Sequence, residues 1–328
     1  MEFRVIDREP DGTLHLHVGP AAAAYIAHPP EGVVRWIDLE GPDPTALATL
    51  QAAFALHPLA IADCAAYGRQ SRFEDYDDYL FIVSHAFSAK PHAPLDIQIH
   101  EVHAFLGQQF LITVHDNPVT AHNQIWLEAQ HDPRLLAKGI ARVWLQTVSA
   151  MVDGSEAMID NLREELDILE REVVEAGANI ELTTAFRIKR TTVAMRRVLR
   201  PLRDALRQLV ELSEDPDPRI PSNTARYIHA LTDRVVRLTE FVEDARETAN
   251  SIVAGYHAVQ ATHANTAMKR LTIFSAVFLP LGFVVGFWGQ NFTQLPVNED
   301  WAFAFMLVSM LALPLATLLW IRTWYRRL

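Results

Sequence analysis

The residues with the clearest chemical potential are three that end a long apolar run: Gly289, Gln290 and Asn291. If the run is a helix, its last carbonyl groups have no partner within the helix and carry partial negative charge. A ring of such carbonyls from several chains, together with the amide oxygens of Asn291, can hold the water molecules of a hydrated cation. This arrangement suits a hard ion such as Mg²⁺, which gives up its water reluctantly. Taken alone, the motif also describes an ordinary helix stop.

Charged residues flank the apolar segments with opposite signs at the two ends. Glu299 and Asp300 follow the motif and can draw cations to that side. The basic residues lie at the other ends of the segments; they are Lys269, Arg270, Arg322, Arg326 and Arg327. By the positive-inside rule, both termini are predicted to be cytoplasmic and the loop to lie outside. Lys269 and the C-terminal arginines would then form a basic collar at the cytoplasmic exit.

Two uncharged runs, 271–288 and 301–321, are predicted to cross the membrane. The first is long enough to span a hydrocarbon core of about 30 Å at about 1.5 Å per residue. Small residues such as Gly282 permit either close helix packing or a wide pore wall, and Leu271, Phe278 or Leu279 can form a narrow apolar gate. Because two helices per chain cannot enclose a pore, a pore requires several copies.

A single long helix is predicted to lead into the first of these runs. Apolar residues alternate at spacings of three and four from Ile228 to Val259, which favours a left-handed supercoil with a partner helix. Ser222 is a good candidate for the N-cap. Since no helix breaker precedes Pro280, the simplest interpretation is one helix from about Ser222 to about Asn291, roughly 100 Å long.

The first 145 residues show the short alternating runs of a mixed α/β domain. Strands are predicted at Thr13–Val18, Val33–Leu39, Tyr79–Phe87, Ile97–Leu106 and Phe110–Val114. Helices are predicted from Asp43 to Leu56, with Pro44 in the first turn, and from Val119 to Gln130.

A helical hairpin over 146–213 is predicted to follow, with arms of opposite charge. Residues 153–175 hold nine acids and two arginines, whereas residues 187–207 hold eight bases and one acid. Two arms that attract each other, or two solvated faces, are the plain interpretation. Alternatives are a basic arm that binds nucleic acid and an acidic arm that concentrates cations near a path.

Composition excludes several classes of protein. The net charge of −11 argues against a dedicated nucleic-acid binder, and the lone Cys64 leaves no internal disulfide or cysteine metal cluster. No phosphate loop, nucleophile elbow or His-Glu-x-x-His motif is present, so neither an enzyme nor a cofactor is expected. The first residues lack the pattern of a cleaved secretory signal, which predicts a cytoplasmic N-terminal part.

His257 and His263 lie on the predicted long helix and are candidates for handling protons or a metal ion. The default interpretation is that both are ordinary solvated helix positions.

Six segments result from these observations. They are a cytoplasmic α/β domain (1–145), a cytoplasmic helical stalk (146–270), a pore-lining transmembrane helix (271–291), a periplasmic loop (292–300), a second transmembrane helix (301–321) and a basic cytoplasmic tail (322–328).

The membrane segment resembles the CorA family of divalent-cation transporters. The matching residues are Met268-Lys269-x-Leu271-Thr272, Phe278-x-Pro280-Leu281 and Gly286-x-x-Gly289-x-Asn291-Phe292. Earlier segments agree, including 57–63, 74–81, 113–115 and 196–204. The resemblance covers most of the chain and implies a pentameric funnel, in which an α+β cytoplasmic domain and a long stalk precede two C-terminal transmembrane helices. It also implies pore-lining roles for Met268, Leu271, Leu279, Gly282 and Asn291.

Two departures from the family pattern affect the expected function. Gln290 stands where the selectivity motif Gly-Met-Asn usually has Met, and Ala254 stands where magnesium channels of the family have a regulatory carboxylate. Both favour the zinc-transporting, ZntB-like branch. The expected protein is a homopentamer in the cell inner membrane that moves divalent cations of the Zn²⁺/Mg²⁺/Co²⁺/Ni²⁺ class, with Asn291 contacting the ion through its waters and with possible proton coupling left open. Alternatives are a Mg²⁺/Co²⁺ channel gated by cytoplasmic metal and a membrane-anchored sensor or scaffold without transport.

Overall fold

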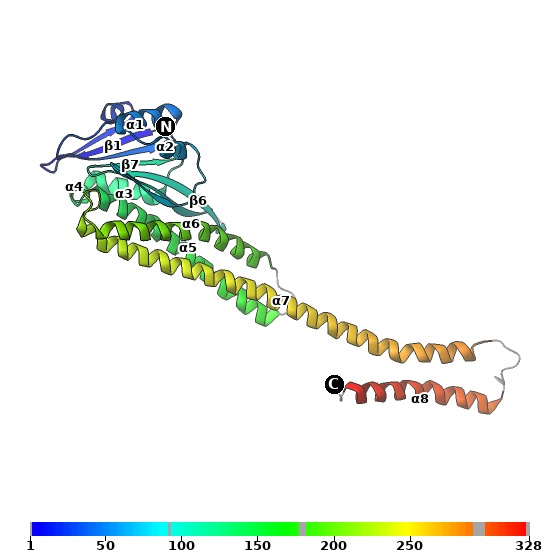
Figure 1. Cartoon of the computed structure of the whole chain (residues 1–328). Coiled ribbons are helices and arrows are strands. Elements are labelled where there is room, and N and C mark those ends of the chain that lie inside the picture. Colours follow the sequence, from blue (N-terminus) through cyan, green and yellow to red (C-terminus); the bar gives the residue numbers. More distant parts are fainter. Residues whose placement is uncertain (1, 91–92, 177–181, 291–298, 326–328) are drawn as a thin grey trace. The chain divides into compact units, whose positions relative to one another are not determined.

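The computed structural model describes residues 2–90, 93–176, 182–290 and 299–325 (Figure 1). The chain separates into two compact units, Met1–Val174 with Glu181–Val253 and Glu175–Ile180 with Ala254–Leu328. Helix α7, Ala225–Trp288, contributes its first half to one unit and its second half to the other. The six-segment division by sequence stays a prediction.

The first unit is built on a seven-stranded sheet with the order β2-β1-β3-β7-β6-β5-β4. The strands are β1 (Glu2–Arg8), β2 (Leu14–Val18), β3 (Val34–Glu40), β4 (Arg72–Tyr76), β5 (Tyr79–Lys90), β6 (Ala93–Leu106) and β7 (Phe110–His115). Neighbouring strands pair antiparallel except β3 and β7, which run parallel. This parallel pair brings Asp38 of β3 level with Thr113 of β7.

One face of the sheet is covered by short helices. They are η1 (Gly19–Tyr25), α1 (Pro44–Phe54) and α2 (Pro58–Ala65). The Asp43 side chain caps α1 by accepting a hydrogen bond of 2.7 Å from the backbone N–H of Ala46, as the sequence predicts for an acid before Pro44. Because alternate strand residues point to opposite faces, Ile37 and Leu39 join this core while Asp38 points away from it.

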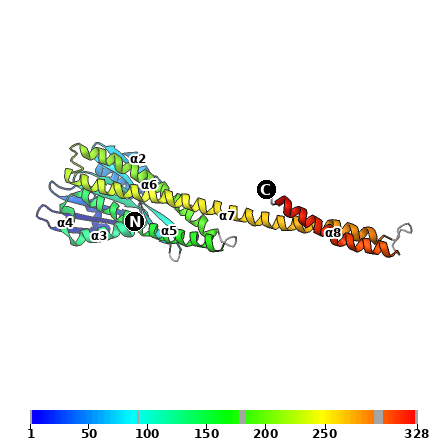
Figure 2. The same ribbon diagram turned by 90° about the horizontal axis from the view of Figure 1, so that it is seen from below.

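The remaining helices of the first unit lie on the other side of the sheet (Figures 1 and 2). They are α3 (Thr120–His131), α4 (Pro133–Ala137), α5 (Ile140–Ala176), α6 (Thr183–Glu214) and the first half of α7. Arg234 of α7 pairs with Asp153 and Glu156 of α5, and Arg200 of α6 pairs with Glu243 of α7 at 2.5 Å. The oppositely charged arms are therefore each tied to α7, which the sequence pattern alone did not indicate.

The regular apolar spacing of α7 is buried as predicted, but only in the first unit. Eight of its residues are buried; they are Ile228, Leu231, Val235, Leu238, Val242, Ala245, Ala249 and Ile252. Tyr256 and Val259 continue the pattern but are only half-buried. Burial of the stripe thus ends where the first unit ends, at about Val253.

Several boundaries differ from the sequence-based expectations. Ser222 lies in a 3-10 turn, η2 (Ser222–Thr224), so it does not cap α7, which begins at Ala225. The helix ends at Trp288 rather than at Asn291. Strands β1 and β4 and helix α2 were not among the predicted elements. Helix α8, Asp300–Tyr325, is longer than the predicted span 301–321.

The core of the first unit should respond to loss of a buried side chain. Leu50 is fully buried in α1, whereas Leu59 in α2 is 67% exposed. Leu50→Ala is expected to lower the free energy of unfolding by about 2–5 kcal/mol through lost burial and a residual cavity. Leu59→Ala, the matched control, is expected to change it by less than about 0.5 kcal/mol. Thermal unfolding of the full chain in detergent measures both, and equal shifts would contradict this core assignment.

Candidate functional site

The second unit contains two helical segments that are apolar enough to cross a membrane. Their most apolar windows, in Ser222–Trp288 and in Asp300–Thr323, have mean hydropathies of 2.0 and 2.2. In a single chain, 0% and 6% of these windows are buried. Helices of a folded soluble core would be largely buried, so these two need lipid or further copies of the chain to cover them.

Most of the membrane segment of α7 is exposed in the single chain, including Phe274 and Phe283 as well as the predicted pore-lining residues. Met268, Leu271 and Leu279 are 63%, 64% and 77% exposed. Ser275, Gly282, Gly286 and Gly289 continue the same face at spacings of three and four residues and are exposed too. The structure therefore places the predicted pore-lining residues Met268, Leu271, Leu279 and Gly282 on a single stripe.

A second, half-buried stripe lies on another side of the same segment. Its members are Ile273, Ala276, Val277, Pro280, Leu281, Val284 and Trp288. The ring of Trp288 lies 6.4 Å, centroid to centroid, from that of Phe305 in α8, and Ala302 of α8 is fully buried. We infer that this stripe is the side of α7 that α8 partly covers.

Pro280 lies within the half-buried stripe rather than on the exposed one. The helix continues through it from Ala225 to Trp288. Proline removes one backbone hydrogen bond and crowds the preceding turn. Any local distortion therefore falls on the covered side, and the exposed stripe stays regular in spacing.

The glycines of the exposed stripe are not required by contacts within one chain. A Cβ atom added at Gly282 or Gly286 would meet nothing within 4 Å. Their small size is thus available for close approach of another molecule. Gly289 differs, because a Cβ there would lie 3.1 Å from the carbonyl oxygen of Val285.

Backbone hydrogen bonds pair some of the carbonyl groups at the end of α7. The N–H of Gly289 donates to the carbonyl of Val285 at 2.9 Å, and the N–H of Gln290 donates to the carbonyl of Phe287 at 3.3 Å. Two of the terminal carbonyls are therefore already paired. The predicted contribution of Asn291 falls outside the described residues, which end here at residue 290.

The acids predicted to attract cations and the bases predicted to form a collar lie near the ends of the apolar segments. Glu299 and Asp300 are exposed at the start of α8, where the Glu299 carbonyl accepts from the N–H of Ala302 at 3.0 Å. Lys269 on α7 and Arg322 near the end of α8 are also exposed. Arg326 and Arg327 lie outside the described residues, so the predicted basic collar is seen only in part. His257 and His263 are exposed on α7, as the default interpretation expected.

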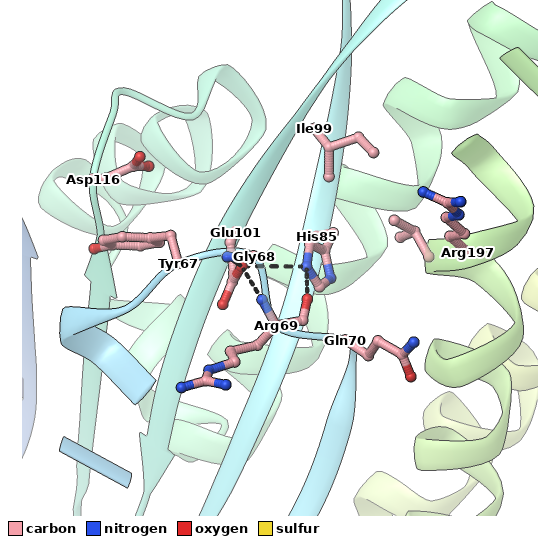
Figure 3. A pocket seen from close by; sticks show the side chains of 10 residues that line it. Tyr67, Gly68, Arg69, Gln70, His85, Ile99, Glu101, Asp116 and Arg197 are labelled. Carbon is pink, nitrogen blue, oxygen red and sulfur yellow. Dashed lines mark hydrogen bonds and ion pairs between the residues drawn. The ribbon is translucent and has the colours of Figure 1, made fainter. Parts of the chain in front are cut away.

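A polar cavity of about 450 Å³ lies in the first unit (Figure 3). Tyr67 and Asp116 lie on one side of it, and Ile99 of β6 and Arg197 of α6 lie on the other. Glu101 of β6 forms part of its wall and pairs across the strands with His85 of β5. The cavity therefore opens beside a buried carboxylate.

Glu101 is held by several donors although it is only 6% exposed. Its Oε2 accepts from the backbone N–H groups of Gly68 at 2.7 Å and Arg69 at 3.0 Å, and its Oε1 lies 2.9 Å from Nε2 of His103. Burial alone would raise the pKa of Glu101, but contacts with His103, His85 and the Gly68 N–H outweigh it and hold the pKa well below the usual value of 4.5. The carboxylate is therefore ionised at neutral pH.

Sequence analysis did not identify this network. His103 and Glu101 share a strand face, and His85 joins them only through the register of β5 and β6. The detectable signal was polar residues at alternate positions of a strand that is otherwise strongly apolar. Single-sequence periodicity does not supply the register that brings His85 to Glu101.

Proteins with related sequences are named as metal transporters. YfjQ of Bacillus subtilis, provisionally named a metal ion transporter, is 27% identical over 287 residues, which is 87% of each chain. The cobalt/magnesium transport protein of Thermotoga maritima is 24% identical over 78% of this chain and 73% of its own. The zinc transport protein of Yersinia enterocolitica is 22% identical over 55% and 54% of the two chains. These matches do not single out the zinc branch.

The fold has also been seen in a solved transporter. The magnesium transporter of Methanocaldococcus jannaschii superposes with a TM-score of 0.78 over 97% of each chain, at 19% sequence identity. The predicted architecture is confirmed by this likeness: an α+β domain, a long helix and two C-terminal apolar helices.

The stability of the first unit should depend on pH through Glu101. Because the folded pKa is depressed, its contribution is complete above the unfolded value near 4.5 and is lost as the pH falls through the folded value. Glu101→Gln is expected to cost about 1.5–3 kcal/mol at pH 7, the worth of hydrogen bonds to a charged acceptor. Thermal melts should show a constant difference from wild type between pH 7 and about 5, shrinking below that. Glu128→Gln, on the exposed side of α3, is the control; a difference that grows on acidification would refute this role.

A family profile settles the relationship over nearly the whole chain. The profile described as "CorA-like Mg2+ transporter protein" matches residues 31–326, which include both apolar helices and most of the first unit. A match of this extent shows that the chain belongs to the CorA-like Mg²⁺ transporter family.

Proposed function

We propose that the protein transports divalent metal cations across a membrane as a homopentamer, with one α7 helix from each chain around a central path. The observation that carries this proposal is the exposed stripe from Met268 to Gly286 on an unbroken helix. A stripe that is apolar and small, and that its own chain leaves uncovered, fits a face between copies. The names of the related proteins supply the class of cargo.

The proposed path begins at the loop between the two membrane helices. Glu299 and Asp300 raise the local cation concentration, and Gly289, Gln290 and Asn291 form the selectivity motif that holds the hydrated ion through its waters. The ion then passes Gly282, where the wall is wide, and the apolar narrowings at Leu279, Leu271 and Met268. At the exit it meets the basic collar of Lys269, Arg322, Arg326 and Arg327.

The orientation and the membrane follow from the same charges. The basic residues flank the ends of the apolar helices away from the loop, which supports cytoplasmic termini and an external loop under the positive-inside rule. We propose the cell inner membrane as the location, with the first unit in the cytoplasm.

The choice of cation rests on two positions. Gln290 in place of the usual Met and Ala254 in place of a regulatory carboxylate favour zinc transport, with proton coupling as one mode. The alternatives are a Mg²⁺/Co²⁺ channel gated by cytoplasmic metal and a sensor or scaffold that moves no ion. Uptake of Zn²⁺, Mg²⁺, Co²⁺ and Ni²⁺ into proteoliposomes, with and without a proton gradient, separates the three.

Removal of the amide at Asn291 tests the selectivity motif. Asn291→Ala is expected to abolish cation uptake in proteoliposomes while the oligomer stays intact in size-exclusion chromatography, because the hydrated ion loses its ring of amide oxygens. Asn298→Ala makes the same change in the loop and should leave uptake near the wild-type rate. Unchanged uptake in Asn291→Ala would remove the motif from the mechanism.

A second variant tests whether Leu279 forms an apolar constriction in the proposed path. Leu279→Ala should raise flux because a wider constriction stays wetted; if the constriction adds about 1.4 kcal/mol to the barrier, the rise is about tenfold. Leu311→Ala is a matched control, since Leu311 is 68% exposed but lies on α8, outside the proposed path. Flux that rises equally in both variants would show that Leu279 does not line the path.

A further inference from the structure

A buried cluster of one carboxylate and two imidazoles lies on the side of the sheet that faces away from α1 and α2. Asp38 comes from the middle of β3, His115 ends the neighbouring parallel strand β7, and His122 lies in the first turn of α3. The side chains of all three are 0% exposed. The chain thus brings three potential metal ligands from distant parts of the sequence into its dry interior.

The possible ligand atoms already point at one another. Nε2 of His122 lies 2.7 Å and Nε2 of His115 lies 3.3 Å from Oδ1 of Asp38. Taking one atom from each residue, all three lie within 4.8 Å of one another. Because metal–ligand bonds to these atoms are about 2.0–2.2 Å long, one ion can contact all three after small side-chain shifts.

The tautomer of His115 is fixed by a backbone contact. Its Nδ1 lies 2.8 Å from the carbonyl oxygen of Asn117. A carbonyl can only accept, so Nδ1 carries the hydrogen and Nε2 of the neutral ring presents a lone pair toward Asp38. This is the usual way in which proteins orient a metal-binding histidine. A lone pair and a carboxylate oxygen that face each other in a buried space repel each other, so either a metal cation or a proton on Nε2 must lie between them.

The carboxylate is oriented by groups of its own. Thr113 donates to Oδ1 of Asp38 at 2.5 Å, and the Trp36 indole N–H donates to the Thr113 hydroxyl oxygen at 3.0 Å. Arg4 binds the other oxygen, Oδ2, through its Nε at 3.0 Å. Oδ1 is therefore the oxygen left facing the two imidazoles, with its position set by neighbours that do not contact the ion.

Part of the cluster also has unmet hydrogen-bonding capacity. Nδ1 of His122 and Nε2 of His115 are buried and lack a well-oriented hydrogen-bond partner among the described residues. Such orphaned polar atoms are uncommon in protein interiors and call for an explanation. An ion at the centre accounts for Nε2 of His115.

We propose that Asp38, His115 and His122 bind one transition-metal dication of the Zn²⁺ or Co²⁺ class within the first unit, separate from the transport path. Two imidazole nitrogens and one carboxylate oxygen suit such ions, whereas Mg²⁺ and Ca²⁺ prefer oxygen ligands throughout. Three protein ligands leave the fourth tetrahedral position for a water molecule. The proposal does not depend on transport and is tested by equilibrium binding.

The test uses the full chain in detergent after dialysis against a chelator. Added Co²⁺ is expected to give the intense visible bands of a four-coordinate ion, which the weakly absorbing hydrated ion in a transport path does not give. His122→Gln should lose these bands and bind Zn²⁺ at least about tenfold more weakly by calorimetry, since even an outer partner of a metal ligand is worth about 10–100-fold in affinity.

His131→Gln provides the matched control, because His131 is exposed on the same helix α3. This variant should retain both the bands and the affinity. A wild-type spectrum of hydrated Co²⁺ alone would overturn the proposal and leave a protonated imidazole as the positive charge beside Asp38. The wild-type spectrum decides the matter even if His122→Gln fails to fold, and equal Zn²⁺ affinities of wild type and a folded His122→Gln would also refute it.

Discussion

The structure depends on helix α7, whose apolar residues a single chain buries in the first half of the helix but not in the second. The first half of α7 buries an apolar stripe from Ile228 to Ile252 against the rest of the first unit. The second half leaves Leu271 and Leu279 64% and 77% exposed. An apolar surface of this kind is unfavourable in water. Lipid, further copies of the chain, or both must therefore cover this surface.

The two sides of the membrane segment of α7 differ in what they contact within the chain. On one side, α7 packs against α8 through contacts such as that between the rings of Trp288 and Phe305. The side that holds Leu279 and Gly282 stays uncovered, and glycine there has no Cβ contact to satisfy within the chain. This division supports the assignment of one side to packing within a chain and the other to the space between chains. It also explains why Pro280, on the packing side, can be accommodated without interrupting the exposed stripe.

The sheet of the first unit carries ionic clusters on both of its faces. Glu101 with His85 and His103 lies on the side of α1 and α2, while Asp38 with His115 and His122 lies on the other side. Buried charges are costly unless they are paired and hydrogen-bonded. Backbone N–H groups and histidines meet this need at Glu101, and Arg4 and Thr113 meet it at Asp38. The two clusters therefore place histidines beside buried carboxylates on both faces of the sheet.

The sequence by itself determined the features that depend on local pattern. Uninterrupted apolar runs predicted both membrane helices, the three-and-four spacing predicted the buried stripe of α7, and Asp43-Pro44 predicted the start of α1, because each follows from residues close together in the chain. Only the tertiary structure decided which acids pair with which bases, as when Arg234 joins Asp153 and Glu156 across α5 and α7. It likewise brought His85 to Glu101 through strand register, and Asp38 to His115 through the parallel pairing of β3 and β7. Those contacts join residues from 16 positions apart (His85 and Glu101) to 81 positions apart (Asp153 and Arg234). Local periodicity carries no information on register or on which helix covers which face.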